Sequence, residues 1–145
     1  MIAIPQLIVA WLNSDSAIQA AVSGRISTIL DPADGLPAIV IGPVSGGPVA
    51  MPQASLDLVE KWMVPIYCIA GRRSNGLDDL PDNETAWEVA ALVADAMAKL
   101  DLERFTTEKA ELVSATVASA TTSIDPNAGF GRVLVTASVS AWRRS

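Results

Sequence analysis

The stretch Leu56–Gly71, LDLVEKWMVPIYCIAG, holds the densest run of aromatic and β-branched residues in the chain. One face of a strand built from it is apolar at every second residue: Trp62, Val64, Ile66, Cys68 and Ala70. The opposite face carries a second apolar set: Val59, Met63, Tyr67 and Ile69. Apolar residues on both faces indicate a strand that is covered from both sides. We therefore expect helices or a neighbouring subunit to sandwich the second half of this strand.

Pro65 lies near the middle of the stretch, and proline has no N–H to donate to a sheet. We expect one long strand that bends at Pro65. The lone cysteine, Cys68, lies in the same strand, where we interpret it as a small buried hydrophobic residue rather than a reactive thiol. A single cysteine also excludes an internal disulfide framework.

Length and composition narrow the class of protein. The chain has 145 residues, half of them hydrophobic, which predicts a single domain over 1–145 with its own core. It has no histidine, so the commonest general base and metal ligand are missing. Its net charge of −6 is opposite to that of duplex-binding domains, so we do not expect tight DNA binding.

The apolar start, MIAIPQLIVAWLN, could be mistaken for a targeting signal. It lacks a basic n-region, and it is shorter than the roughly 20 residues that span a bilayer. We expect a soluble protein that is not exported.

Spacing and turn residues predict the elements of the first half. Residues 5–12 form a helix with one apolar face, and a second helical segment ends at Gly24. Short strands follow at 25–30 and 38–41. The glycine- and proline-rich residues after the second strand, up to Pro52, are predicted to be a flexible connection.

The second half contains the main helix and a hairpin. Asp82 or Asn83 caps the helix, whose inward stripe is Ala86, Val89, Ala90, Val93, Met97 and Leu100. Trp87 lies beside this stripe with Ala91 and Ala94, and we interpret it as core packing, with a subunit contact as the alternative. The hairpin strands, 112–122 and 130–142, meet at a turn over 125–129.

The apolar faces of the two hairpin strands set the layers of the fold. The first strand offers Val113, Ala115 and Val117, and the second offers Val133, Val135, Ala137, Val139 and Ala141. The other face of the second strand is mostly polar. The sequence therefore predicts an α+β single domain, with a mainly antiparallel sheet of about five strands packed against one long helix and N-terminal helical segments.

The polar loop 71–81 is the place to look for chemistry, because loops of this length are often functional. Asp78, Asp79 and Asp82 form a carboxylate trio there, but no histidine or fourth ligand completes a metal site. The glycines of 42–47 lack the spacing of phosphate-binding loops, and no SxxK motif occurs. We predict no catalytic, cofactor-binding or metal residues, no cofactor and no enzyme activity. Unchanged function after replacing Asp78 and Asp79 with asparagine would remove the carboxylate alternative.

Four stretches in their order resemble the tail terminator proteins of long-tailed bacteriophages, also called tail completion or minor tail proteins. They are Leu12–Ile26 (LNSDSAIQAAVSGRI), Leu36–Ser45 (LPAIVIGPVS), Trp62–Gly71 and Phe130–Arg144. The likeness lies in the order and total length, and the chain departs from it at Pro65 and in the glycine-rich stretch 42–48.

The resemblance implies a structural virion protein that is assembled in the host cytoplasm. Such proteins form a ring, typically a hexamer, at the head-proximal end of the tail tube. The ring ends tube polymerisation and provides the head-attachment surface. The implied partners are other copies of the chain, the tail tube protein and the head–tail connector protein, with no membrane. Alternatives are a head–tail connector or neck protein, a polymerising tube protein, and a small carboxylate-dependent enzyme or ligand-binding domain.

A closed ring requires two different interaction patches on each subunit. Candidates lie in the 71–81 loop and at the end of the last strand: Arg72, Arg73, Asn75, Asp78, Asp79, Trp142, Arg143 and Arg144. A ring of acidic subunits presents negative surface to DNA. We therefore expect DNA to pass through the lumen without specific binding.

Overall fold

The computed structural model describes residues 4–29, 35–48, 58–74, 79–103, 105–106, 110–122 and 131–143. Its helices are α1 (Ile4–Asn13), α2 (Ser16–Val22) and α3 (Asn83–Glu103). Its strands are β1 (Ile26–Ser27), β2 (Ala38–Ile41), β3 (Ser45–Pro48), β4 (Leu58–Ala70), β5 (Arg72–Ser74), β6 (Asp79–Pro81), β7 (Phe105–Thr106), β8 (Ala110–Thr122) and β9 (Gly131–Arg143).

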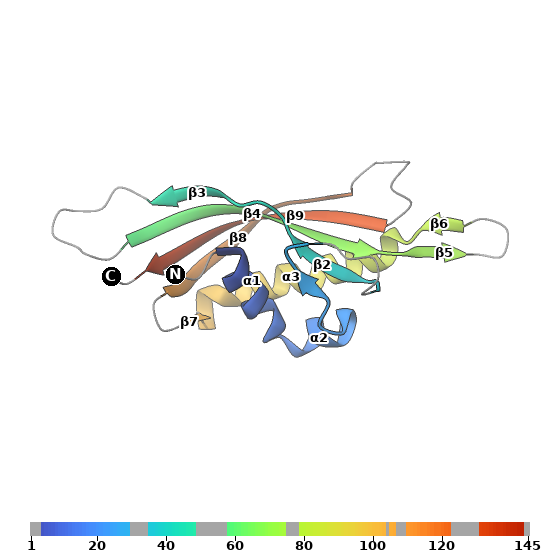
Figure 1. Ribbon diagram of the computed structural model, residues 1–145, viewed down its shortest axis with the longest axis horizontal. Helices are drawn as coiled ribbons and strands as arrows, with labels where there is room; N and C mark the ends of the chain where they lie inside the picture. The colour runs from blue at the N-terminus through green and yellow to red at the C-terminus, as the bar shows by residue number, and fades with distance from the viewer. Residues whose placement is uncertain are drawn as a thin grey trace.

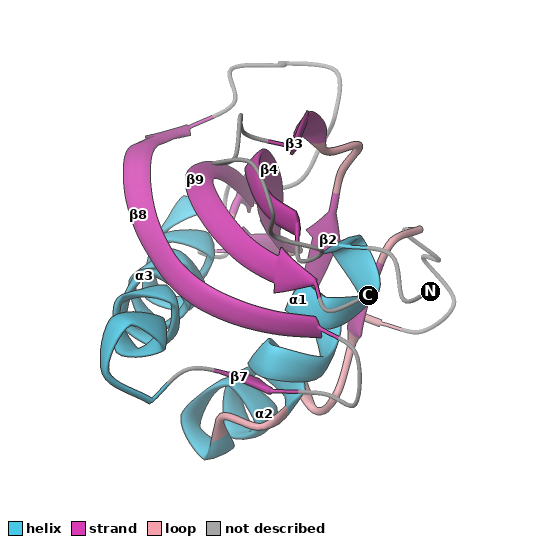
Figure 2. Ribbon diagram, turned by 90° about the vertical axis from the view of Figure 1, so that its left-hand side faces the viewer, coloured by secondary structure: helices cyan, strands magenta, loops and turns pink. Residues whose placement is uncertain are grey.

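A sheet of seven strands in the described part of the chain organises the molecule. Its order is β1-β2-β4-β9-β8-β7, with β3 also paired to β4, and only β1 and β2 run parallel. The three helices lie on one face of this sheet, and no described element covers the other, which we call the open face (Figures 1 and 2). The predicted α+β class is confirmed. The sheet has more than the expected five or so strands because short β3 and β7 extend its edges.

β4 is one unbroken strand, as predicted, and Figure 1 shows that it curves along its length. On one side it pairs with β9 from Leu58 to Ala70. On the other side β3 covers 60–63 and β2 covers 66–69, so the partner changes at the proline. The Pro65 carbonyl still accepts a hydrogen bond from the Gly42 N–H at 2.8 Å. Pro65 itself has no N–H to donate in return.

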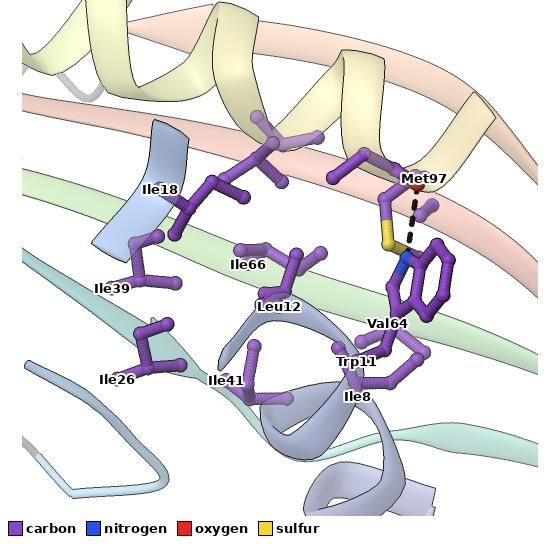
Figure 3. Close-up of a cluster of buried hydrophobic side chains, with 14 of the residues drawn as sticks. Ile8, Trp11, Leu12, Ile18, Ile26, Ile39, Ile41, Val64, Ile66 and Met97 are labelled. Atoms are coloured by element: carbon purple, nitrogen blue, oxygen red, sulfur yellow. Dashed lines mark hydrogen bonds between the residues drawn. The ribbon is translucent and has the colours of Figure 1, made fainter. Parts of the chain in front are cut away.

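The core lies between the sheet and the helices, and the predicted inward residues are buried. All six predicted side chains of the α3 stripe, with Ala96, are at most 2% exposed. They meet Leu7, Ile8, Leu12 and Ile18 from the N-terminal helices, and Val64 and Ile66 from β4 (Figure 3). The indole Nε1 of Trp11 donates a hydrogen bond to the Ala96 carbonyl at 2.9 Å. This bond ties α1 to α3.

Side-chain caps define the starts of two helices. The Asp15 carboxylate accepts hydrogen bonds from the N–H groups of Ala17 and Ile18, at 2.9 and 3.1 Å, and starts α2. Asp82 accepts from the Thr85 N–H at 3.1 Å and confirms the predicted cap of α3. At the end of α2 the sequence indicated Gly24, but Ser23 is the C-cap, at φ 52° in the left-handed region.

The hairpin strands are antiparallel neighbours, and β9 alternates as predicted, with Val133, Val135, Ala137, Val139 and Ala141 fully buried. On β8 the predicted inward residues Ala115 and Val117 lie on the core side, and Leu112, which the prediction left out, lies there too. The register shifts between Leu112 and Ser114, and again between Val117 and Ser119, so Leu112 and Ala115 face the core together. A bulge adds one residue, which breaks the period of two that the prediction used. The expected turn at 125–129 lies outside the described residues.

Three other segments differ from expectation. The strand predicted at 25–30 is only two residues, Ile26–Ser27. The flexible connection after β2 contains β3, which pairs with β4 at Glu60–Met63. The polar loop 71–81 contains a two-stranded antiparallel ribbon, β5–β6. Among the described helices, none has the length and apolarity needed to cross a membrane.

Cys68 is fully buried on β4, as predicted, and burial raises the pKa of its thiol from 9.0 to about 12. The folded protein should therefore not react with Ellman's reagent at pH 8, and labelling should appear only on unfolding. Because the raised pKa favours the neutral thiol, this contribution to stability is complete below pH 9 and is lost as pH rises from 9 towards 12. Rapid labelling of the native protein at pH 8 would contradict the burial.

Candidate assembly surfaces

The β5–β6 ribbon carries three of the predicted interaction residues. Arg72 and Arg73 are in β5, where they pair with Pro81 and Leu80. Asp79 begins β6 opposite Ser74. The side chains of these three predicted residues, and all of Asn75 and Asp78, lie outside the described residues. Backbone pairing nevertheless places the ribbon beyond the end of β4.

The base of the ribbon is held by one carbonyl. The Gly71 oxygen accepts hydrogen bonds from the N–H groups of Asp82, at 3.0 Å, and Gly131, at 3.2 Å. Asp82 in turn caps α3, and its Oδ2 accepts from the Thr85 hydroxyl at 2.6 Å. Thus the end of β4, the start of β9 and the start of α3 meet below the ribbon. A contact made by the ribbon is therefore attached directly to the core elements.

The second predicted set lies at the other end of the sheet. Trp142 pairs with Val59 on β4 and with Glu111 on β8. Arg143 pairs with Leu58 and Ala110. The Trp142 side chain is half-buried; the Arg143 side chain and all of Arg144 lie outside the described residues.

The two predicted sets are not brought together. The pairing of β4 with β9 places Arg143 beside the first residue of β4, whereas Arg72 follows the last. Strands of this length place the two sets about 40 Å apart. Figure 1 shows the ribbon and the chain termini at opposite ends of an elongated molecule. The sequence could not reveal this separation, since it depends on the antiparallel register.

The open face of the sheet is poor in charge. Its described side chains include Met63, Tyr67, Leu134 and a row of serines and threonines, and its charged ones are Lys61 and Arg132. The Arg132 guanidinium lies 5.4 Å from the centre of the Tyr67 ring, within cation–π range. We expected helices or a neighbouring subunit to cover both faces of β4. The helices cover one face, so the expectation of a neighbouring subunit applies to the open face.

Among the described side chains, the exposed carboxylates lie on the helical side. Four carboxylate residues of α3 are exposed: Glu84, Glu88, Asp95 and Glu103. Trp87 lies among them and is 42% exposed, so the interpretation as core packing is wrong. It lies one position away from the buried Ala86, which turns its ring outward. The alternative, a subunit contact, stays a prediction.

One cleft was not anticipated. It encloses about 270 Å³ between the helix ends and is lined by Trp11, Ser14, Asp15, Ser16, Ala17, Lys99 and Glu103. Its charged groups already have structural roles, because Asp15 caps α2 and lies 3.5 Å from the Lys99 Nζ. In the described part of the chain, no three His, Cys, Asp or Glu residues form a group that could hold a metal ion.

Comparison with known proteins places this geometry in a family. A search of curated proteins gives no match. A chain from a solved structure described as the virion of a native gene transfer agent particle has the same fold, with a TM-score of 0.65 and 18% identity, over 97% of this chain and 95% of that one. The family model of tail completion protein gp17 matches residues 6–141. The chain thus belongs to the tail completion protein gp17 family, and it is a structural protein of the phage virion tail.

Proposed function

We propose that the protein forms a ring at the head-proximal end of the tail tube, where it ends tube polymerisation and provides the surface for head attachment. The observation that carries this proposal is the separation of the two candidate sets at opposite ends of β4 and β9. A terminator needs two different surfaces that point in opposite directions along the tail. Strands aligned with the tail axis would give each subunit such surfaces.

In this arrangement one end of the sheet contacts the tube and the other contacts the head. The β5–β6 ribbon forms one contact surface, and the ends of β4 and β9, with Trp142, form the other. The partners are thus the tail tube protein and the head–tail connector protein. These are axial contacts, and the contacts that close the ring lie elsewhere on the subunit.

In the proposed ring, either the α3 side or the open face of the sheet lines the lumen, and the two differ in charge. The exposed carboxylates lie on α3, while the charged side chains described on the open sheet face are Lys61 and Arg132. Our expectation of a negative, non-binding lumen therefore requires the α3 side to line it. A lumen lined by the open face would overturn that electrostatic argument and leave the terminator role intact.

Tail length after silencing of the gene tests the proposal. We expect electron micrographs of the lysate to show overlong tails without heads, because the tube has lost its stop. Tails of normal length beside separate filled heads would favour the connector alternative. Normal infectious particles would contradict both roles.

Variants at each end test the axial arrangement. Arg72→Glu with Arg73→Glu changes one end, and Trp142→Ala changes the other. We expect one variant to give overlong tails and the other to give tails of normal length that lack heads. Asp95→Ala, which removes an exposed charge from the middle of α3, is the matched control and should leave particles normal. Identical defects from both ends would contradict the assignment.

A further inference from the structure

We propose that the ring closes by strand pairing, in which the outer edge of β8 in one copy joins the outer edge of β3 in the next copy. This inference rests on the proposed ring and names the surface that closes it. The occupant of the β8 edge is therefore a second copy of this chain.

The edge of β8 is open along most of its length. β7 pairs only with Glu111 and Leu112, and no described strand pairs with the outer side of Thr116–Thr122. Figure 2 shows β8 as the curved outermost strand, with β7 beneath one end. In this segment Thr116, Ala118, Ser119, Ala120 and Thr121 are exposed. Unpaired backbone groups on such an edge are a template for another strand.

This edge lacks the charged side chains and prolines that commonly block pairing. Natural edge strands carry charged side chains or prolines that repel a second chain. Residues 112–122, LVSATVASATT, contain neither. Their small side chains also leave room for a neighbouring backbone. Because these eleven residues carry no charge that would repel a second strand, we infer that another chain pairs with this edge.

The complementary edge is present on the same chain. β3 pairs with β4 on one side, and no described strand pairs with its other side. Its sequence, Ser-Gly-Gly-Pro, is also uncharged, and its one proline, Pro48, is the last residue, so Ser45–Gly47 keep their N–H groups for a partner. Each copy has a net charge of −6, so two copies repel through most of their surface. Two charge-free edges can meet without that repulsion.

Strand directions agree with this pairing. β3 and β9 both run antiparallel to β4, and β8 runs antiparallel to β9. In a ring whose axis follows the strands, every copy keeps the same direction. β8 of one copy and β3 of the next therefore run antiparallel, which is the more stable ladder.

The pairing also requires a stagger. Within one copy, β3 lies level with Glu60–Met63 of β4, and these residues lie level with the start of β8. Because β7 occupies that start, the next copy's β3 must shift along β8 towards Thr122. A sheet that closes on itself needs such a stagger between its edges.

A disulfide trap in assembled tails tests the proposal. Gly47→Cys provides one thiol on β3, where an added Cβ meets no atom within 4 Å. Gly47 pairs with Lys61, so its side-chain position points to the open face. The second thiol is introduced on β8, at Thr116, Ser119 or Thr121, which share the open face through their β9 partners. Cys68 is buried and does not compete.

Ala120→Cys is the matched control, since Ala120 is equally exposed on β8 but pairs with the buried Val135 and so faces the helices. Tails carrying each double variant are purified, oxidised with copper phenanthroline and run on a non-reducing gel. We expect open-face positions to give covalent multimers that are lost on reduction, and Ala120→Cys to give none. Gly47→Cys alone reports side reactions.

The outcomes separate this inference from the proposed function. Tails of normal length that contain the variants but give no multimers from any open-face position overturn the strand pairing alone. Multimers from Ala120→Cys as strong as from its neighbours also overturn it, because a ladder requires a period of two. Tail length in the silencing experiment tests the terminator role independently.

Discussion

Gly131→Ala should lower the free energy of unfolding by about 3 kcal/mol, the upper end of the usual cost of overpacking. A Cβ at this position would overlap the carbonyl group of Asp82 and lie 2.8 Å from the Asn83 nitrogen. Both neighbours are backbone atoms at the start of α3, so no side chain can rotate away. The helix start, or the first residues of β9, must move. Urea denaturation followed by circular dichroism measures the loss.

Gly47→Ala is the matched control, because a Cβ there meets nothing within 4 Å. We expect it to change stability by no more than about 0.5 kcal/mol, as exposed substitutions usually do. Equal losses from the two alanines would show that the close packing at Gly131 does not determine its cost. Gly131→Ala should also disturb the β5–β6 ribbon, since the Gly131 N–H shares the Gly71 carbonyl with Asp82.

Trp11→Ala should lower the free energy of unfolding by about 4 kcal/mol, as expected for a large buried aromatic residue. The ring is 7% exposed and packs against Phe105 at a centroid distance of 5.7 Å. Its Nε1 also donates to Ala96 on α3. The variant loses the packing and the hydrogen bond together. Trp11→Phe keeps much of the packing and should lose only about 1 kcal/mol for the hydrogen bond.

Trp87→Ala is the variant with which Trp11→Ala is compared. Because Trp87 is 42% exposed, we expect its replacement to cost clearly less than Trp11→Ala. Chemical denaturation of the three variants by circular dichroism gives the ranking. A loss at Trp87 as large as that at Trp11 would contradict the burial of the two rings.

The sequence predicted those elements in which burial imposes a regular period. Val133 to Ala141 alternate without interruption, and the α3 stripe keeps helical spacing from Ala86 to Leu100. Both patterns are regular because each element packs one whole face against the core. The prediction was incomplete on β8, where the bulge between Leu112 and Ser114 places Leu112 on the core side together with Ala115. A bulge depends on the partner strand, and nothing in the local sequence marks it.

The candidate surfaces were predictable only in part. The arginines of β5 and Trp142 were selected by residue type, but their separation comes from the thirteen-residue register of β4 with β9. β3 was missed because Ser-Gly-Gly-Pro has low strand propensity, and its strand form depends on pairing with β4. The uncharged run of β8 was visible in the sequence. Its meaning required knowing that this strand lies at the edge.

The bulges in β8 have a consequence for subunits made in excess of tails. A flat, uncharged edge on each free copy would nucleate fibres, which would remove the protein before any tail could use it. The irregularities at Leu112–Ser114 and Val117–Ser119 twist the strand locally. Only a neighbour that follows this curvature can pair along its length. If copies associate through β8 as proposed, the same two irregularities would favour a closed ring over endless stacking of unused copies.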